Sequence, residues 1–114
     1  MSKLQFILLL LLLSCSGSKD FDETPTPIGG DNKVRSVFQQ TLGSTYYDVT
    51  GSKVRFSIRI NKDGVIAQVS MSQRTSNERI NRTLVFALKD QIRFTPATKD
   101  GKRVEAHFEY EFTF

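Results

Sequence analysis

The sequence has no tryptophan, and only one cysteine and one histidine among its 114 residues. A single cysteine excludes a disulfide within the chain. Cys15 and His107 are also too small a set of ligands for a zinc site, so we expect no metal ion and no cofactor. The chain has no stripe of Lys and Arg interleaved with stacking aromatic side chains, although its formal charge is +4. We therefore expect no nucleic-acid partner.

No apolar run in the sequence is long enough to cross a membrane. The longest covers residues 4–13 and is interrupted only by Gln5, whereas a spanning helix needs about 20 residues. Lys3 precedes this run and the small Ser14 follows it, which is the layout of a secretory signal. We therefore assign residues 1–14 to a signal peptide rather than to a membrane anchor.

The apolar run ends in Leu12-Leu13-Ser14-Cys15, which resembles the lipobox of bacterial lipoproteins. This resemblance implies that the Cys15 thiol receives a diacylglycerol, that the chain is cut just before it, and that the new amine is acylated, for example with palmitate. Two or more acyl chains hold a protein firmly on a membrane. The alternative is an ordinary cleaved signal with an incidental cysteine, but the position of the only cysteine favours lipidation.

Residues 15–32 are rich in Gly, Ser, Pro, Thr and acidic residues, which predicts a flexible linker after the lipidated cysteine. Its fully extended length is at most roughly 60 Å. Asp20, Asp22 and Glu23 form an acidic cluster behind Lys19 that resembles the export signals of Bacteroidota surface lipoproteins. The alternative is a simple solvated linker. The folded domain is then expected over residues 33–114.

The first half of this domain predicts a helix and a β-hairpin. Apolar residues at helical spacing predict a helix over residues 32–42, capped by Asp31 or Asn32 and ended by Gly43. Strict alternation predicts a strand over residues 53–60. A turn ending in Gly64 then leads to a second strand over residues 65–72. Its inner face is expected to carry four residues: Val65, Ala67, Val69 and Met71.

The second half predicts a helix and a long strand. The helix is expected over residues 77–92, with Thr75 and Glu78 as a capping box. Pro96 predicts an extended segment over residues 93–97. Unbroken alternation predicts a final strand over residues 103–114. The order helix–strand–strand–helix–strand gives a two-layer α+β domain, in which two helices cover one face of a three-stranded antiparallel sheet.

The polar residues form no evident catalytic set. His107 lies in the middle of the final predicted strand, among Glu105, Glu109 and Glu111. We interpret this row as a solvated strand face or a recognition face, rather than as a pair of catalytic carboxylates. The sequence therefore predicts a protein that is not an enzyme.

Several short motifs resemble those of the C-terminal domain of TonB-type energy transducers, in the form common in Bacteroidota. The motifs are Pro27-Ile28-Gly29-Gly30, Asp63-Gly64, Phe94-Thr95-Pro96-Ala97 and Gly101-Lys102-Arg103-Val104. The resemblance covers residues 26–114. It implies a domain that binds the N-terminal box of TonB-dependent outer-membrane receptors, or another envelope protein, by adding a strand to its sheet.

By the family pattern, the final strand is the binding edge, which makes Arg103, Glu105, His107, Glu109 and Glu111 the candidate partner-binding residues. With the lipid at Cys15, we expect a cell-envelope protein anchored at the outer membrane and facing the periplasm. We do not expect it to transmit energy from a motor, because a lipid anchor cannot replace a motor-coupled helix. The alternative function is that of a structural or accessory envelope lipoprotein with a TonB-like fold and no transport role.

Overall fold

The computed structural model describes residues 21–114, so the predicted signal peptide and Cys15 lie outside the described residues. The elements are, in chain order, α2 (Gly30–Leu42), the 3₁₀ helix η1 (Gly43–Val49), β1 (Lys53–Ile60), β2 (Ile66–Gln73), α3 (Glu78–Gln91), β3 (Ala97–Lys99), β4 (Lys102–Val104) and β5 (Ala106–Thr113). Between residues 21 and 114, no helix combines the length and the hydropathy of a membrane span.

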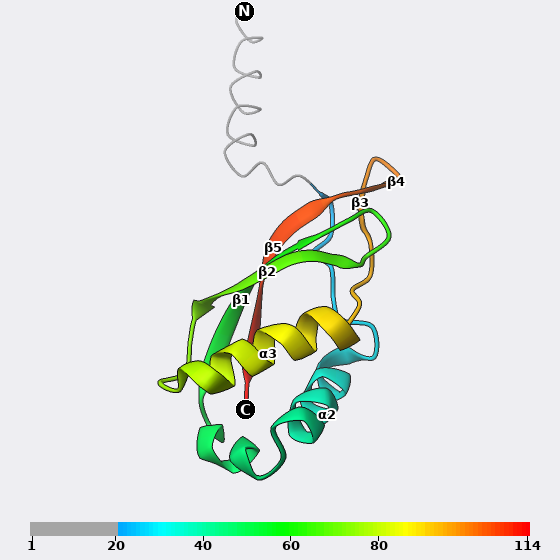
Figure 1. Cartoon of the computed structure of the whole chain (residues 1–114). Helices are drawn as coiled ribbons and strands as arrows, with labels where there is room; N and C mark the ends of the chain where they lie inside the picture. Colours follow the sequence, from blue (N-terminus) through cyan, green and yellow to red (C-terminus); the bar gives the residue numbers. More distant parts are fainter. Residues whose placement is uncertain (1–20) are drawn as a thin grey trace, which may run out of the picture.

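The main sheet is antiparallel and has the strand order β2-β1-β5. Both helices lie on one face of it, as Figure 1 shows, so the predicted two-layer α+β fold is confirmed. The bounds of β1 agree with the predicted strand, and Gly64 takes the positive φ of 85° that the hairpin turn requires.

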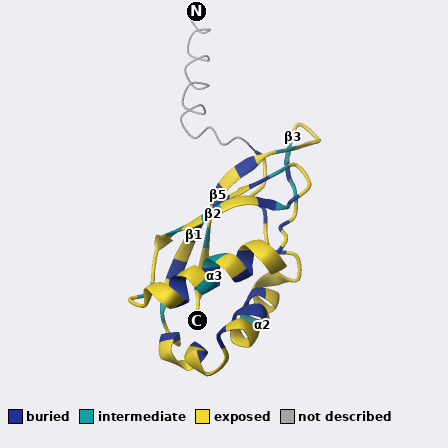
Figure 2. Ribbon diagram, in the orientation of Figure 1, coloured by how far each residue is buried: buried dark blue, intermediate teal, exposed yellow. Residues whose placement is uncertain are grey.

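Aromatic rings join the helix layer to the sheet. The ring of Phe38 in α2 has its centroid 6.1 Å from that of Phe56, 5.2 Å from that of Phe112 and 5.7 Å from that of Phe114. Helix α3 contributes Leu84 and Leu88, which are fully buried. Figure 2 shows buried positions alternating with exposed ones along the strands, which is the arrangement of a sheet with one dry face.

The predicted final strand over residues 103–114 is wrong in one respect, because it is split at Glu105. Residues before the split belong to β4, which pairs with β3 in a separate two-stranded sheet. Residues after it belong to β5, which pairs with β1 along its whole length. The alternation of apolar and polar residues does not reveal this split, because it continues without a break from β4 into β5.

The inner face predicted for the second strand is only partly correct. Val69 and Met71 are half-buried on that face, but Ala67 is exposed and Ile66 is buried. Ile60 pairs with Ile66 whereas Arg59 pairs with Gln68, so Ala67 is an extra residue in the ladder. Such a β-bulge reverses the alternation on one side of itself.

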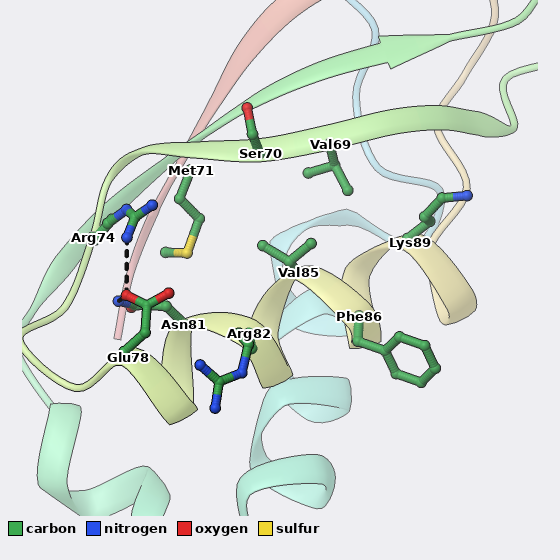
Figure 3. Close-up of a pocket in the computed structure, with 10 residues that line it drawn as sticks. All are labelled: Val69, Ser70, Met71, Arg74, Glu78, Asn81, Arg82, Val85, Phe86 and Lys89. Carbon is green, nitrogen blue, oxygen red and sulfur yellow. Dashed lines mark hydrogen bonds and ion pairs between the residues drawn. The ribbon is translucent and has the colours of Figure 1, made fainter.

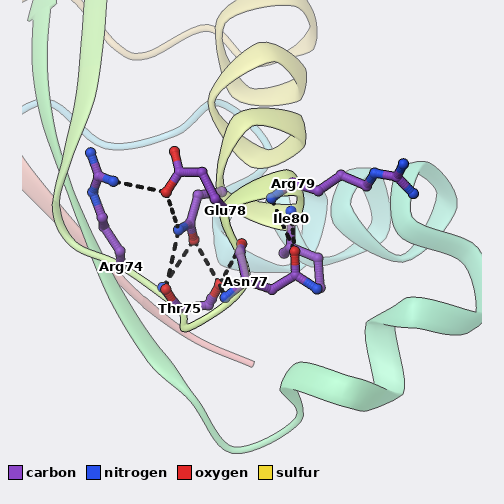
Figure 4. A network of polar contacts seen from close by, with 7 residues as sticks. Arg74, Thr75, Asn77, Glu78, Arg79 and Ile80 are labelled. Atoms are coloured by element: carbon purple, nitrogen blue, oxygen red, sulfur yellow. Dashed lines mark hydrogen bonds and ion pairs between the residues drawn. The ribbon is translucent and has the colours of Figure 1, made fainter.

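Both predicted helix caps are wrong. Helix α2 begins after Gly29, which has a φ of 94°, and neither Asp31 nor Asn32 caps it. Helix α3 is capped by Asn77, whose side-chain oxygen accepts hydrogen bonds from the N–H groups of Arg79 and Ile80 at 3.0 and 3.2 Å (Figure 4).

Thr75, the residue predicted to cap α3, instead contacts the buried side chain of Asn81. Its hydroxyl donates to Asn81 Oδ1 at 2.7 Å, and its N–H donates to the same oxygen at 2.9 Å. The Asn81 amide donates in return to the Thr75 carbonyl and to Glu78. The only buried polar side chain of the described core is thereby satisfied, and it fixes the turn between β2 and α3.

Part of the predicted linker packs against the domain. Phe21 is buried, and the chain from Asp22 to Ile28 runs antiparallel to residues 93–98. The Asp22 N–H donates to Thr98 O, the Thr95 N–H to Thr26 O and the Ile28 N–H to Arg93 O, each at 2.8 Å. Residues 21–28 are therefore packed onto the domain that was expected over residues 33–114.

Candidate peptide-binding edge

Strand β5 is an edge strand, which is the position that strand addition requires. It pairs with β1 on one side, and no strand of the described residues pairs with its other side. In an edge strand, the backbone N–H and C=O groups of every second residue have no partner in a neighbouring strand.

The hydrogen bonds at the end of the strand show which backbone groups point outward. The Phe114 N–H donates to Ser52 O at 2.9 Å, so the backbone N–H of Phe114 points toward β1. Along an antiparallel strand, the backbone N–H and C=O groups of successive residues point alternately to one side of the strand and to the other. The backbone groups of His107, Glu109, Glu111 and Thr113 therefore point away from β1, toward the open edge.

Arg35 of α2 covers the C-terminal end of this open edge. Its Nη2 donates to the Thr113 carbonyl oxygen at 3.2 Å, which also confirms that Thr113 points away from β1. The Arg35 guanidinium lies 4.8 Å from the centre of the Phe112 ring, and its Nη1 donates to Tyr46 Oη at 3.1 Å. The open row that remains on β5 is that of His107, Glu109 and Glu111.

The start of α2 is also tied to β5. Tyr110 Oη donates to Asp31 Oδ1 at 2.6 Å, and Asp31 lies in the first turn of α2 rather than at its N-cap position. Burial raises the pKa of the Tyr110 hydroxyl well above its ordinary value, and the hydrogen bond to the Asp31 carboxylate raises it further. Helix α2 therefore lies over the β5 half of the sheet and is fixed there by two polar contacts.

The polar face of β5 contacts its own sheet. Glu111 lies 3.0 Å from Arg55 and 3.9 Å from Lys53, and Glu109 lies 4.0 Å from Arg55. Ser72 of β2 donates to Glu109 at 2.9 Å. Each of the four charged side chains keeps about half of its surface exposed, so the glutamates are partly neutralised and still accessible.

His107 and Ser57 lie side by side on this face, with Ser57 Oγ 2.7 Å from His107 Nε2. Serine and histidine at this distance resemble part of a nucleophile–base set, and the two residues are too far apart in the sequence for their contact to be predicted from it. No acidic group within residues 21–114 orients the histidine ring, and the pair lies on an open sheet face. The contact therefore has the features of a cross-strand polar pair.

The five candidate residues do not form one row. Glu105, at the split between β4 and β5, is exposed, and Arg103 lies in β4, where its guanidinium is 3.4 Å from Asp63. Only His107, Glu109 and Glu111 share the edge of β5. The described part of the chain also contains no cluster of His, Cys, Asp or Glu that could hold a metal ion.

Three of the four motifs noted in the sequence meet at the end of the sheet where the hairpin turn joins β1 to β2. The Phe94 N–H donates to Gly64 O at 3.0 Å, and Pro27 forms an isolated bridge with Phe94. A side chain at Gly64 would run into the Phe94 carbonyl oxygen. These residues join the hairpin turn, the segment before α2 and the segment after α3, so their role is structural.

The family model described as TonB C terminal matches residues 31–114. No curated protein and no solved structure matches the chain.

Proposed function

Because the chain belongs to the TonB C-terminal family, whose domains are interaction modules of the cell envelope, we propose that it binds the N-terminal peptide of an outer-membrane receptor. The peptide adds a fourth strand to the sheet along β5. In this function the domain is a binding module and not an enzyme.

The observation that carries the proposal is the open edge of β5. His107, Glu109 and Glu111 each direct a backbone N–H and C=O away from β1, and no described strand covers them. An extended peptide can pair with such groups whatever its side chains are, and its affinity then comes mainly from the backbone. Arg35 limits the register of the peptide, because it already occupies the Thr113 carbonyl.

Charge adds a smaller preference. Glu109 and Glu111 favour a peptide with Lys or Arg at alternate positions, but Arg55 already lies beside both carboxylates. Exposed ion pairs contribute on the order of 0.2–1 kcal/mol each. We therefore expect the charge of the peptide to change affinity only a few-fold.

The proposed location follows from the lipid expected at Cys15. A lipidated amino terminus holds the domain at the outer membrane on its periplasmic side, where the N-terminal peptides of receptors are accessible.

The experiment compares two substitutions at one position. Glu109→Pro removes the outward N–H without removing a ladder bond to β1, whereas Glu109→Gln keeps that N–H and removes the charge. Titration of both variants with receptor N-terminal peptides should show binding lost with proline, by at least about tenfold, and kept within a few-fold with glutamine. Circular dichroism checks that both variants fold.

Undiminished binding by a folded Glu109→Pro variant would exclude pairing through this N–H. Absence of binding by the unmodified protein to every receptor peptide would instead support the accessory-lipoprotein function.

A further inference from the structure

A groove of about 490 Å³ lies at the other edge of the sheet, between β2 and α3 (Figure 3). It is separated from the β5 edge by the whole width of the main sheet. The function proposed for β5 does not use it.

The floor of this groove is apolar. Val69 and Met71 of β2 and Val85 of α3 are each half-buried, and Figure 3 shows Val69 and Met71 pointing from the strand toward the helix. Phe86 adjoins them and is 72% exposed, which makes it one of the few large apolar side chains on the described surface. A contiguous apolar surface of this kind is typical of an interaction site.

The backbone along the groove is open. Arg55 O accepts from Ser72 and Lys53 O from Gln73, so the odd-numbered residues of β1 face β2. Ser57 is the next odd-numbered residue of β1 and lies opposite Ser70 of β2. Ser57 and Ser70 therefore form backbone hydrogen bonds with each other. Val69 and Met71, on either side of Ser70, direct their N–H and C=O groups outward. The bulges at both ends of β2 limit this open stretch to a few residues.

The rim of the groove is positively charged. Arg74, Arg82 and Lys89 line it, against a single carboxylate, Glu78, which lies 2.9 Å from Arg74. The side chains of Arg82 and Lys89 make no ion pair or hydrogen bond within residues 21–114. A second copy of this groove would bring cations against cations, so the charge favours an acidic occupant.

We propose that the groove binds a short extended peptide with apolar side chains at alternate positions and acidic side chains at its ends. The peptide adds a strand along β2, places its apolar side chains between β2 and α3, and places its carboxylates near Arg82 and Lys89. The domain thereby holds two different peptides, one at each edge of the same sheet.

The experiment uses a synthetic peptide of about seven residues, with valine at alternate positions and glutamate at both ends. A matched peptide carries lysine in place of glutamate, and a third has its backbone N–H groups methylated on the strand-pairing side. Fluorescence anisotropy with the full chain should show tighter binding of the glutamate peptide than of either of the other two. Amide shifts in the NMR spectrum should be confined to β2 and α3.

Variants locate the binding. Phe86→Ala should weaken binding of the glutamate peptide by about tenfold, whereas Tyr47→Ala, at another exposed aromatic residue, should leave it unchanged. Arg82→Glu combined with Lys89→Glu should reverse the preference between the glutamate and lysine peptides. Glu111→Pro, at a residue whose side chain contacts Lys53 and Arg55 of β1, should leave this binding unchanged, which separates the groove from the β5 edge.

Three outcomes would overturn the proposal. Equal affinity for the glutamate and lysine peptides would remove the acidic specificity, and unchanged binding of the methylated peptide would exclude strand addition. Sedimentation of the free protein as a dimer that Phe86→Ala dissociates would assign the groove to a second copy of the chain.

Discussion

Gly64 shows how one residue position can depend on a distant segment. Its φ of 85° is strained for any residue with a side chain, and a Cβ there would meet the Phe94 carbonyl oxygen. Gly101 has a similar φ of 80° but open space around the corresponding position. The two glycines therefore separate the cost of the backbone conformation from the cost of the contact.

We expect Gly64→Ala to lower the free energy of unfolding by at least about 2 kcal/mol, and Gly101→Ala by about 1 kcal/mol. Urea denaturation of the two variants measures both values. Equal losses would show that the contact with Phe94 adds nothing to the effect of the positive φ.

Tyr110 should make stability depend on pH in the alkaline range. Burial and the Asp31 carboxylate raise its pKa in the folded state above the ordinary value of 10.0, so the folded protein keeps this proton when the unfolded chain loses it. This contribution is complete below about pH 10 and is lost as the pH rises above it.

The measurement is the difference in unfolding free energy between the unmodified protein and Tyr110→Phe, from about pH 8 to about pH 11. The unmodified protein should be more stable by about 1–2 kcal/mol at the lower pH, because a hydrogen bond to a charged group is lost in the variant. The difference should shrink above pH 10. A constant difference would show that the folded and unfolded states titrate alike.

At the scale of single residues, the sequence predicted local backbone conformation better than it predicted contacts between distant residues. The positive φ of Gly64 followed from its place in a hairpin turn, but its contact with Phe94 did not, because the two are far apart in the chain. The same applies to Arg35 and Thr113, which meet only when α2 packs on the sheet. Asp31 was predicted as a cap because its type suits one, but α2 begins one residue earlier, and the Asp31 carboxylate accepts from the Tyr110 hydroxyl.

At the scale of elements, the segment from Phe21 to Gly29 packs along one side of the domain. It buries the Phe21 ring and hydrogen-bonds with residues 93–98. A chain that begins at Phe21 should therefore be more stable than one that begins at Asn32, by on the order of 2 kcal/mol, since burying one Phe side chain contributes about that much.

Thermal or urea unfolding of the two shortened chains measures this difference. Equal midpoints would show that the segment lies on the domain without stabilising it. The composition of this segment gave no sign of the packing, because its Pro, Thr and Gly residues equally suit a solvated linker. The available signal was Phe21, an apolar residue flanked by acidic residues.

Strand β1 was predicted with its observed bounds. Its apolar and polar residues alternate strictly and turn residues flank it on both sides, so the pattern fits only a strand. Strand β2 was less clear, since Val65, Ile66 and Ala67 follow one another without alternation. That run was the available signal for the bulge. The split at Glu105 left no signal of this kind in the sequence. Whether β4 pairs with β3 or with β1 depends on the packing of the folded domain and not on the local pattern of residues.

At the scale of the whole molecule, the helix–strand–strand–helix–strand order sufficed to predict the two layers, whereas the expectation of an open edge at the final strand came from the family resemblance. The charged groove beside α3 was not predicted, because it depends on which side of the helix extends past the edge of the sheet. The proposed attachment to the membrane also belongs to this scale.

Cys15→Ser should release the protein from the membrane fraction and abolish incorporation of labelled fatty acid, because only a thiol forms the required thioether. Ser16→Ala, which keeps the thiol, is the matched control and should remain attached. Labelling that persists in Cys15→Ser would contradict the lipid anchor.

The antiparallel pairing of residues 22–28 with residues 93–98 has a mechanical consequence. In Figure 1 this segment, drawn in blue, runs lengthwise down to α2, while β5 runs to the C-terminus, which lies far from the upper end of the segment. A tension applied between Phe21 and a peptide held on β5 acts along the segment, so its hydrogen bonds share the load in shear instead of opening one after another. Under such tension the domain should yield at a higher force than the same bonds would bear if they were peeled apart.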